Sequence, residues 1–92
     1  MKLETTASFR RCLRGLSDER LALVLSSMRD AAAAYGQPHL HAGIGLRVIG
    51  DWIECRDALD FRLIFQREGG ALVFSFYGRN SAILARRRNS EF

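Results

Sequence analysis

Arginine dominates the charged residues of this chain and is its clearest chemical signal. Fourteen lysine and arginine residues stand against 10 aspartate and glutamate residues, and Lys2 is the only lysine among them. The net charge is +4 and the isoelectric point is about 9.8. A guanidinium group holds phosphate through paired hydrogen bonds and stacks on bases, and an isoelectric point above about 9 indicates a nucleic-acid partner. A genome rich in G and C produces the same bias toward arginine. The positions of the arginines must therefore decide whether the charge marks a binding site.

Two arginines fall on the polar side of strand-like segments. Arg56 alternates with Ile53 and Cys55, and Arg62 alternates with the apolar residues of the next segment. Successive strand residues face opposite sides of a sheet, so both arginines are predicted away from the core. In the alternative interpretation they are ion-pair partners, and an exposed pair contributes at most about 1 kcal/mol. The acidic neighbours available for such pairs are Glu54, Asp57 and Asp60.

Four side chains have the chemistry for proton transfer, and they are His39, His41, Glu54 and Tyr77. A histidine titrates near neutral pH and can act as an acid or a base. The alternative for the histidine pair is structural: one ring caps the preceding helix and the other packs on the surface. The pair has no evident third ligand for a metal ion. No metal and no cofactor are expected.

The first half of the chain reads as a helical hairpin over residues 8–35. Apolar residues recur at helical spacing from Phe9 to Leu16 and from Leu21 to Tyr35. Thr6 or Ser8 can cap the first helix and Ser17 the second. Gly36 and Pro38 are expected to end the second helix, which leaves both histidines in a loop.

The second half changes to the period of a sheet. Residues 46–49, 52–58, 61–66 and 71–77 are rich in aromatic and β-branched residues and are predicted strands. Turns are expected at residues 50–51 and 69–70, and residues 2–7 can add an edge strand. The residues expected to be buried against the helices are Tyr35, Phe61, Leu63, Phe65, Leu72, Phe74 and Phe76. A short helix is expected after residues 80–81, ending in the basic run Arg86, Arg87 and Arg88, which more often is a solvated tail than a binding site.

Length and composition limit the class of protein. Ninety-two residues predict one domain over residues 1–92, and a core this small leaves stability marginal enough for a partner to matter. No apolar run reaches the roughly 18 residues of a membrane span, and residues 1–14 lack the apolar core of a signal peptide. Cys12 and Cys55 are interpreted as small buried apolar residues rather than a disulfide framework. The expected location is the cytoplasm.

The order of elements, and several local motifs, resemble the RelE/ParE superfamily of toxins. The segments YGQPHLHAGIGLR, WIECRDALDFRLIFQREGGALVFSFYG and RNSAIL are similar to a bacterial subfamily of cytotoxic translational repressors. Its motifs correspond to residues 38–41 and 54–56, Arg62 and Gly78. The resemblance extends over residues 8–84. It implies an α+β fold with an N-terminal helical hairpin on a three- to four-stranded antiparallel sheet and a short C-terminal helix.

The resemblance also implies roles for particular residues. Arg62 corresponds to the arginine that holds the scissile phosphate in mRNA-cleaving relatives, and Arg56 and Arg79 correspond to further basic positions. His41 is the candidate proton-transfer residue, and Arg86 and Arg87 are candidate nucleic-acid contacts. Relatives often continue with a His-Asp-Glu motif and then a tyrosine or histidine, whereas this chain continues with Asn80 and Ser81. Asparagine is neither an acid nor a base near neutral pH.

Two functions follow from this resemblance. In the first, the chain is the toxin of a toxin–antitoxin pair and cleaves mRNA at the ribosome. In the second, it is a non-catalytic binder, either similar to inhibitors of DNA gyrase or an inactive toxin that retains its contact with the antitoxin. The expected partner is a cognate antitoxin, laid as amphipathic segments along grooves of the helical hairpin, and the chain is expected as a homodimer or as a hetero-oligomer with it.

Overall fold

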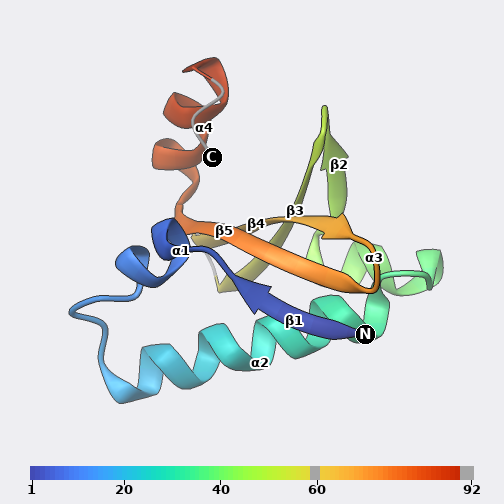
Figure 1. Ribbon diagram of the computed structural model, residues 1–92, viewed down its shortest axis with the longest axis horizontal. Helices are drawn as coiled ribbons and strands as arrows, with labels where there is room; N and C mark the ends of the chain where they lie inside the picture. The colour runs from blue at the N-terminus through green and yellow to red at the C-terminus, as the bar shows by residue number, and fades with distance from the viewer. Residues whose placement is uncertain (59–60, 90–92) are drawn as a thin grey trace.

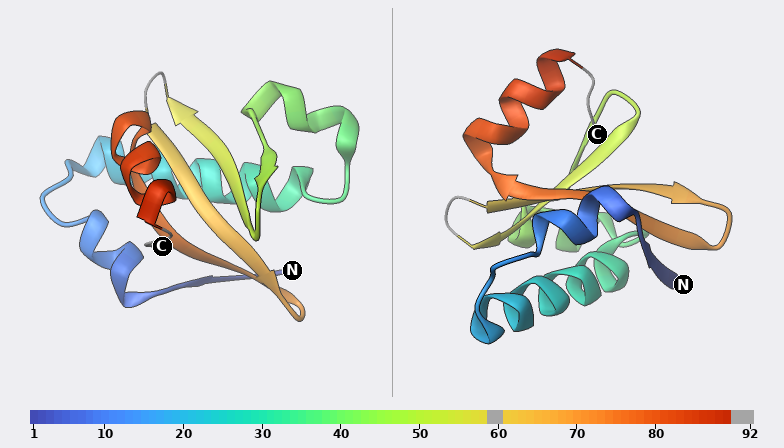
Figure 2. Two further views of the ribbon diagram at one scale, coloured as in Figure 1. Left: turned by 90° about the horizontal axis from the view of Figure 1, so that it is seen from above. Right: turned by 60° about the vertical axis from the view of Figure 1, so that its left-hand side comes forward.

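The computed structural model describes residues 1–58 and 61–89, which form an α+β arrangement of strands and helices (Figure 1). In chain order the elements are β1 (Lys2–Thr5), α1 (Ala7–Cys12), α2 (Asp18–Ala34), α3 (Pro38–Ile44), β2 (Arg47–Ile49), β3 (Trp52–Ala58), β4 (Phe61–Glu68), β5 (Ala71–Arg79) and α4 (Asn80–Asn89). Helices α1 and α2 lie on one side of the sheet and α4 on the other (Figure 2). The predicted fold class is confirmed, with differences in the number of elements.

The sheet has the strand order β1-β5-β4-β3-β2. The four strands from β2 to β5 form the expected antiparallel meander. The strand β1 adds a fifth, parallel to β5, with Lys2 paired to Ala71 and Thr5 to Phe74. The sheet is therefore mixed and five-stranded rather than three- to four-stranded and antiparallel. A strand of four residues with no apolar alternation carries no sign of its partner or direction.

Helices α1 and α2 begin at the predicted caps. The Thr6 side chain accepts a hydrogen bond from the Phe9 amide, and the Ser17 hydroxyl accepts one from the Arg20 amide. Each bond satisfies one of the amides that the first turn of a helix leaves without a partner. Helix α1 packs against β5 and α2 against β3. These two contacts cover one face of the sheet, as expected.

The segment that contains both histidines was expected to be a loop, but it forms helix α3. Pro38 does not only end the preceding helix but begins a new one, because proline is well tolerated in the first turn, where its missing amide hydrogen is not needed. His39 and His41 therefore lie on a helix rather than in a loop. The Nε2 atom of His41 lies 2.9 Å from the Ala34 carbonyl oxygen at the end of α2. This contact is the capping role expected in the structural alternative.

The main core lies between the sheet and α2. Phe65 and Phe74 are fully buried with their ring centroids 4.8 Å apart, and Phe9 approaches Phe74 at 5.9 Å. Leu63 and Leu72 are buried there too, as predicted. Tyr35 and Phe61 were also expected to be buried, but they are only partly buried at the margin of this core.

Phe76 lies on the opposite face from the one predicted. The register of β4 and β5 shifts, because Ile64 pairs with Phe76 and Phe65 with Phe74, which leaves Ser75 as an extra residue. Such a bulge reverses the alternation of the residues beyond it. Phe76 consequently packs with Ile64 and with Ile83 of α4 in a second, smaller apolar cluster. This cluster holds α4 against the far face of the sheet.

The two cysteines differ enough to be distinguished chemically. Cys55 is fully buried, and burial, reinforced by the Asp57 and Glu54 carboxylates, raises the pKa of its thiol to about 12. Because the thiolate is the reactive form, we expect Cys55 to resist a thiol reagent at pH 8 while the partly exposed Cys12 reacts. Titration with Ellman's reagent should count one thiol in the native protein and two in denaturant. Loss of the native signal in Cys12→Ser is the control, and two reactive thiols in the native protein would contradict the burial of Cys55.

Candidate functional site: an arginine pocket on the open face of the sheet

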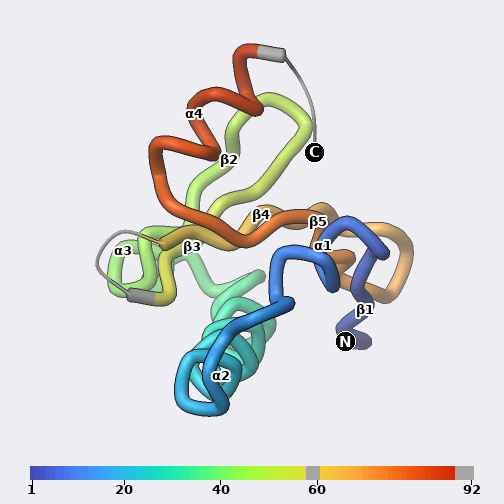
Figure 3. Tube along the Cα trace, turned by 90° about the vertical axis from the view of Figure 1, so that its left-hand side faces the viewer, coloured from blue at the N-terminus to red at the C-terminus, as the bar shows by residue number. Residues whose placement is uncertain are grey.

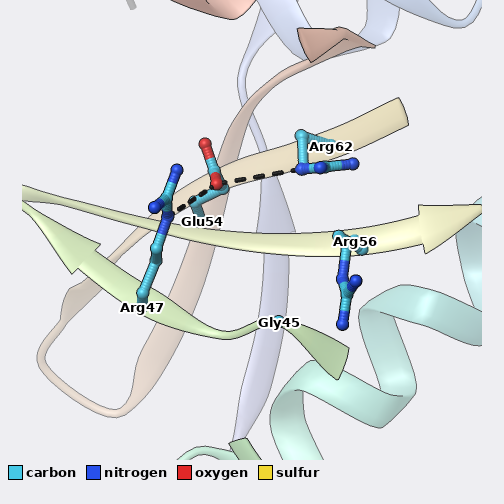
Figure 4. Close-up of a pocket in the computed structure, with 5 residues that line it drawn as sticks. All are labelled: Gly45, Arg47, Glu54, Arg56 and Arg62. Carbon is cyan, nitrogen blue, oxygen red and sulfur yellow. Dashed lines mark hydrogen bonds and ion pairs between the residues drawn. The ribbon is translucent and has the colours of Figure 1, made fainter. Parts of the chain in front are cut away.

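A pocket of about 240 Å³ lies on the face of the sheet that α2 does not cover. It is lined by Gly45, Arg47, Glu54, Arg56 and Arg62, and we refer to it as the arginine pocket (Figure 4). The guanidinium groups of Arg47 and Arg62 flank the Glu54 carboxylate, while that of Arg56 points toward α3 at the edge of the pocket (Figure 4). This arrangement concentrates positive charge where an anionic ligand can reach it.

Strand register brings these residues together. Glu54 and Arg56 alternate with Ile53 and Cys55, which pack in the main core, so Glu54 and Arg56 face away from it. Across the sheet, Arg56 pairs with Arg62 of β4. On the other side of β3, Glu54 pairs with Arg47 of β2. The predicted orientation of Arg56 and Arg62 is confirmed by this geometry.

Glu54 is the electrostatic centre of the pocket. Only 2% of the residue is exposed. Its Oε1 atom accepts a hydrogen bond from Arg47 Nε at 3.0 Å and lies 3.8 Å from Arg62 Nε. Its Oε2 atom is buried and makes no hydrogen bond within the described residues. A buried carboxylate oxygen is costly without a donor, so Oε2 needs a donor from outside the described residues, such as water or a ligand.

Arg56 is positioned by the last turn and the C-cap of α3. Its Nη2 atom donates to the Ala42 carbonyl at 3.3 Å. Gly45 caps α3 in the left-handed conformation, with φ of +62°, and a β-carbon there would collide with the Arg56 side chain. None of the described acidic residues forms an ion pair with Arg56, and Asp60, one of its candidate partners, lies outside the described residues.

Substitution of Gly45 tests this placement. We expect Gly45→Ala to lower the free energy of unfolding by about 1–3 kcal/mol, because the left-handed conformation strains any residue with a β-carbon, and to displace Arg56 from the pocket. The matched control is Gly43→Ala in α3, where a β-carbon meets nothing within 4 Å. That change should be neutral or stabilising by about 0.5–1 kcal/mol. Urea denaturation measures both, and equal effects of the two substitutions would contradict the close approach of Arg56 to Gly45.

Arg79 does not line the arginine pocket. Its backbone pairs with Phe61, and its guanidinium carbon lies 5.0 Å from the centroid of the Phe61 ring. The residue of β5 that pairs with Arg62 is Gly78. Arg79 was a candidate site residue together with Arg56 and Arg62, but Arg47 contributes the third guanidinium of the pocket. Arg47 could have been found from the sequence, because a two-residue turn at residues 50–51 places it opposite Glu54.

The basic residues of α4 stand apart from the pocket lining. The guanidinium carbon of Arg86 lies 4.4 Å from the centroid of the Phe76 ring, and Arg87 is exposed. Figure 3 shows that α4 and the β2–β3 hairpin rise from the same side of the sheet. The charge of α4 therefore lies on the same side of the molecule as the arginine pocket.

Of the four candidates for proton transfer, Glu54 alone lines the pocket. His41 contacts the end of α2, and His39 is exposed on α3. The Tyr77 hydroxyl donates to Asp57 at 2.8 Å, in a network that includes Arg20. Burial and this hydrogen bond raise the pKa of Tyr77 well above its usual value, so the phenol stays protonated at neutral pH.

The described residues, 1–58 and 61–89, bring no three histidine, cysteine or acidic side chains into a group that could hold a metal ion. Among the same residues, no helix has both the length and the apolar character needed to cross a bilayer.

The arrangement of helices and strands is similar to that of a bacterial toxin of known structure. A copper-bound mutant toxin from Helicobacter pylori superposes with a TM-score of 0.62 at 21% identity, over 90% of this chain and 98% of that chain. The solution structure of a conserved hypothetical protein from Helicobacter pylori gives a TM-score of 0.60 at 20% identity, over 88% and 96% of the two chains. No protein-family model and no curated protein matches the sequence. At these identities the likeness establishes the fold.

Proposed function

We propose that this protein is the toxin of a toxin–antitoxin pair and that it cleaves mRNA at the ribosome, with the arginine pocket as its active site. The observation that carries this proposal is a buried carboxylate, Glu54, set among three arginines on an accessible face of the sheet. The fold shared with a solved toxin supports it. So do the net charge of +4 and the resemblance of the strand motifs to toxins that cleave mRNA.

The chemistry assigned to the pocket is attack of a ribose 2′-oxygen on the adjacent phosphorus. In this proposal Glu54 accepts the 2′-hydroxyl proton through Oε2, the carboxylate oxygen without a hydrogen-bond donor among the described residues. Arg47, Arg56 and Arg62 stabilise the negative charge that builds on the phosphate oxygens. The bond from phosphorus to the 5′-oxygen breaks, which leaves a 2′,3′-cyclic phosphate and a 5′-hydroxyl end. Arginine is a poor proton donor at neutral pH, so the proton for the leaving oxygen comes from water and cleavage is slow.

Asn80 is where an added acid should act. It begins α4 two residues after Gly78, which pairs with Arg62. We expect Asn80→His to speed cleavage by about 10²–10⁴-fold, the usual contribution of a positioned general acid. Cleavage of a labelled RNA measures the rate, and Asn80→Gln is the control because it adds no acid. Equal rates in both variants would remove residue 80 from the leaving-group side of the site.

The second candidate is a binder without catalysis, in the manner of gyrase inhibitors or of a toxin that has lost its chemistry. Among the described residues that line the pocket, none besides Glu54 is an acid or base near neutral pH, which favours this function. Expression of the chain in bacteria without an antitoxin separates the two functions. Growth arrest with mRNA cleavage supports the endonuclease, arrest with altered DNA supercoiling supports the gyrase inhibitor, and normal growth contradicts both kinds of toxin.

The proposed partner is an antitoxin with an amphipathic segment. A mainly apolar pocket of about 350 Å³ lies between α2 and α3, lined by Asp30, Ala33, Ala34, Leu40, Gly43 and Ile44. Leu40 is 44% exposed and can accept an apolar side chain of the partner.

An antitoxin complex should bury at least about 1,000 Å² of total surface. We expect Leu40→Glu to weaken capture of the protein encoded beside this one, because it places a charge in the apolar contact. The control is Leu84→Glu on α4, which is similarly exposed but distant from α2 and α3. Failure of the unaltered chain to capture any neighbouring gene product would count against the antitoxin.

A further inference from the structure

Trp52, the only tryptophan of the chain, lies beside the arginine pocket on the same face of the sheet. It opens β3 two residues before Glu54, so the two side chains point the same way and their α-carbons are roughly 7 Å apart. The hairpin register repeats this step, because Arg47 pairs with Glu54 and Ile49 with Trp52. The Trp52 ring therefore lies next to the arginine pocket. The distance between the ring and the pocket is about the spacing of one nucleotide.

The surroundings of Trp52 fix the ring without burying it completely. The side chain is partly exposed and packs against the cluster formed by Ile64, Phe76 and Ile83. On the far side of that cluster, the Arg86 guanidinium covers the Phe76 ring. The cluster that holds Trp52 therefore also contacts α4 through Ile83, and α4 rises on the same side of the sheet as the β2–β3 hairpin (Figure 3).

We propose that Trp52 stacks on the base next to the phosphate held in the arginine pocket, and so restricts the site to unpaired RNA. The inference rests on the proposed function in taking the pocket as a phosphate site. Aromatic side chains stack on splayed, single-stranded bases, whereas the bases of a duplex are stacked within the helix. One stacked base typically changes affinity by about 5- to 150-fold. The indole thus supplies a preference for unpaired bases. The arginines cannot supply it, because they contact any phosphate.

The test uses the full-length chain and a fluorescein-labelled RNA trinucleotide with 2′-O-methyl sugars, which binds without being cut. A second probe is the same trinucleotide with an abasic central residue. The key variant is Trp52→Leu, which retains apolar packing against Ile64 and Phe76 but has no aromatic face. Trp52→Phe restores an aromatic face, and Val48→Ala, on the same hairpin with a side chain that is 72% exposed, is the control.

Trp52→Leu should bind the complete trinucleotide at least about fivefold more weakly than the unaltered chain, with partial recovery in Trp52→Phe and no change in Val48→Ala. The abasic probe should bind the unaltered chain and Trp52→Leu equally. Titration of the unaltered chain should quench its single tryptophan with the complete probe only, and a duplex should bind like the abasic probe.

The outcomes separate this inference from the proposed function. Equal binding of the complete and abasic probes by the unaltered chain overturns the stacking role of Trp52 and leaves the phosphate pocket standing. Binding of neither probe overturns both. The predicted dependence on the base, combined with intact mRNA in expressing cells, supports the role of Trp52 and contradicts the endonuclease.

Discussion

Arg62→Ala should abolish growth inhibition and lower RNA cleavage by about 10²–10³-fold, the usual effect of removing one donor that stabilises charge in a transition state. The Arg62 side chain is only 18% exposed and lies in the pocket 3.8 Å from Glu54 Oε1. It is therefore held in place before a phosphate arrives. Arg62→Lys should recover part of the activity, because an ammonium group provides charge but not the two parallel hydrogen bonds of a guanidinium.

Salt dependence distinguishes a phosphate contact from a structural role. With about three phosphates of single-stranded RNA engaged, the logarithm of affinity should fall with the logarithm of salt concentration at a slope near −2. Arg62→Ala should reduce that slope by about 0.7, the contribution of one contact. The matched control is Arg67→Ala, an exposed arginine of the same strand outside the pocket.

The fold should survive the loss of Arg62, since Arg47 still hydrogen-bonds Glu54 at 3.0 Å. The cost in stability is expected to be about 1 kcal/mol rather than the few tenths typical of a fully exposed position. Full toxicity of Arg62→Ala would assign the pocket arginines to ion pairing with Glu54 and favour a binder that acts through another surface.

Phe74→Ala should cost about 3–5 kcal/mol, the range for deleting a buried phenylalanine ring. Phe74 is fully buried and packs between Phe9 of α1 and Phe65 of β4. Because a domain of this length has a total stability of roughly 5–14 kcal/mol, the variant should lose a large share of it. Urea denaturation followed by circular dichroism measures the change.

Phe74→Leu is the control for this substitution, because it retains much of the apolar volume and should cost clearly less. The exposed Val48→Ala should change stability by no more than about 0.5 kcal/mol. A cost below about 1 kcal/mol in Phe74→Ala would contradict the packing of the sheet against α1 and α2.

The sequence contained most of the information for the arginine pocket, because alternation in a strand is a local property. Arg56 and Arg62 could be assigned to the face away from the main core from the apolar residues on either side of them. The two-residue turn at residues 50–51 sets the strand register that pairs Arg47 with Glu54. Where the alternation breaks, the same reasoning fails. The extra residue Ser75 moves Phe76 to the other face, and no local pattern announces it.

The remaining differences between the predicted and the observed structure arise from strand pairing between distant residues and from the start of a helix. The assignment of Arg79 depended on where β5 sits against β4, and the register places Gly78, not Arg79, opposite Arg62. Helix α3 was missed because Pro38 is compatible with both the end of one helix and the first turn of another. The capping contact of His41 becomes evident only once that helix is present.

The parallel pairing of β1 with β5 also determines when the sheet can be completed during synthesis. Lys2 pairs with Ala71, so the first strand made must wait for a partner 69 residues later in the chain (71 − 2). At about 5–20 residues per second, that interval is roughly 3–14 s. Until then the nascent chain lacks β5, which lies between β1 and β4 in the sheet, and the arginines of β3 and β4 have no finished sheet to hold them. Under the proposed function, we expect the growing polypeptide to be harmless to the ribosome that makes it, because the sheet that holds the arginine pocket is complete only after β5 has emerged.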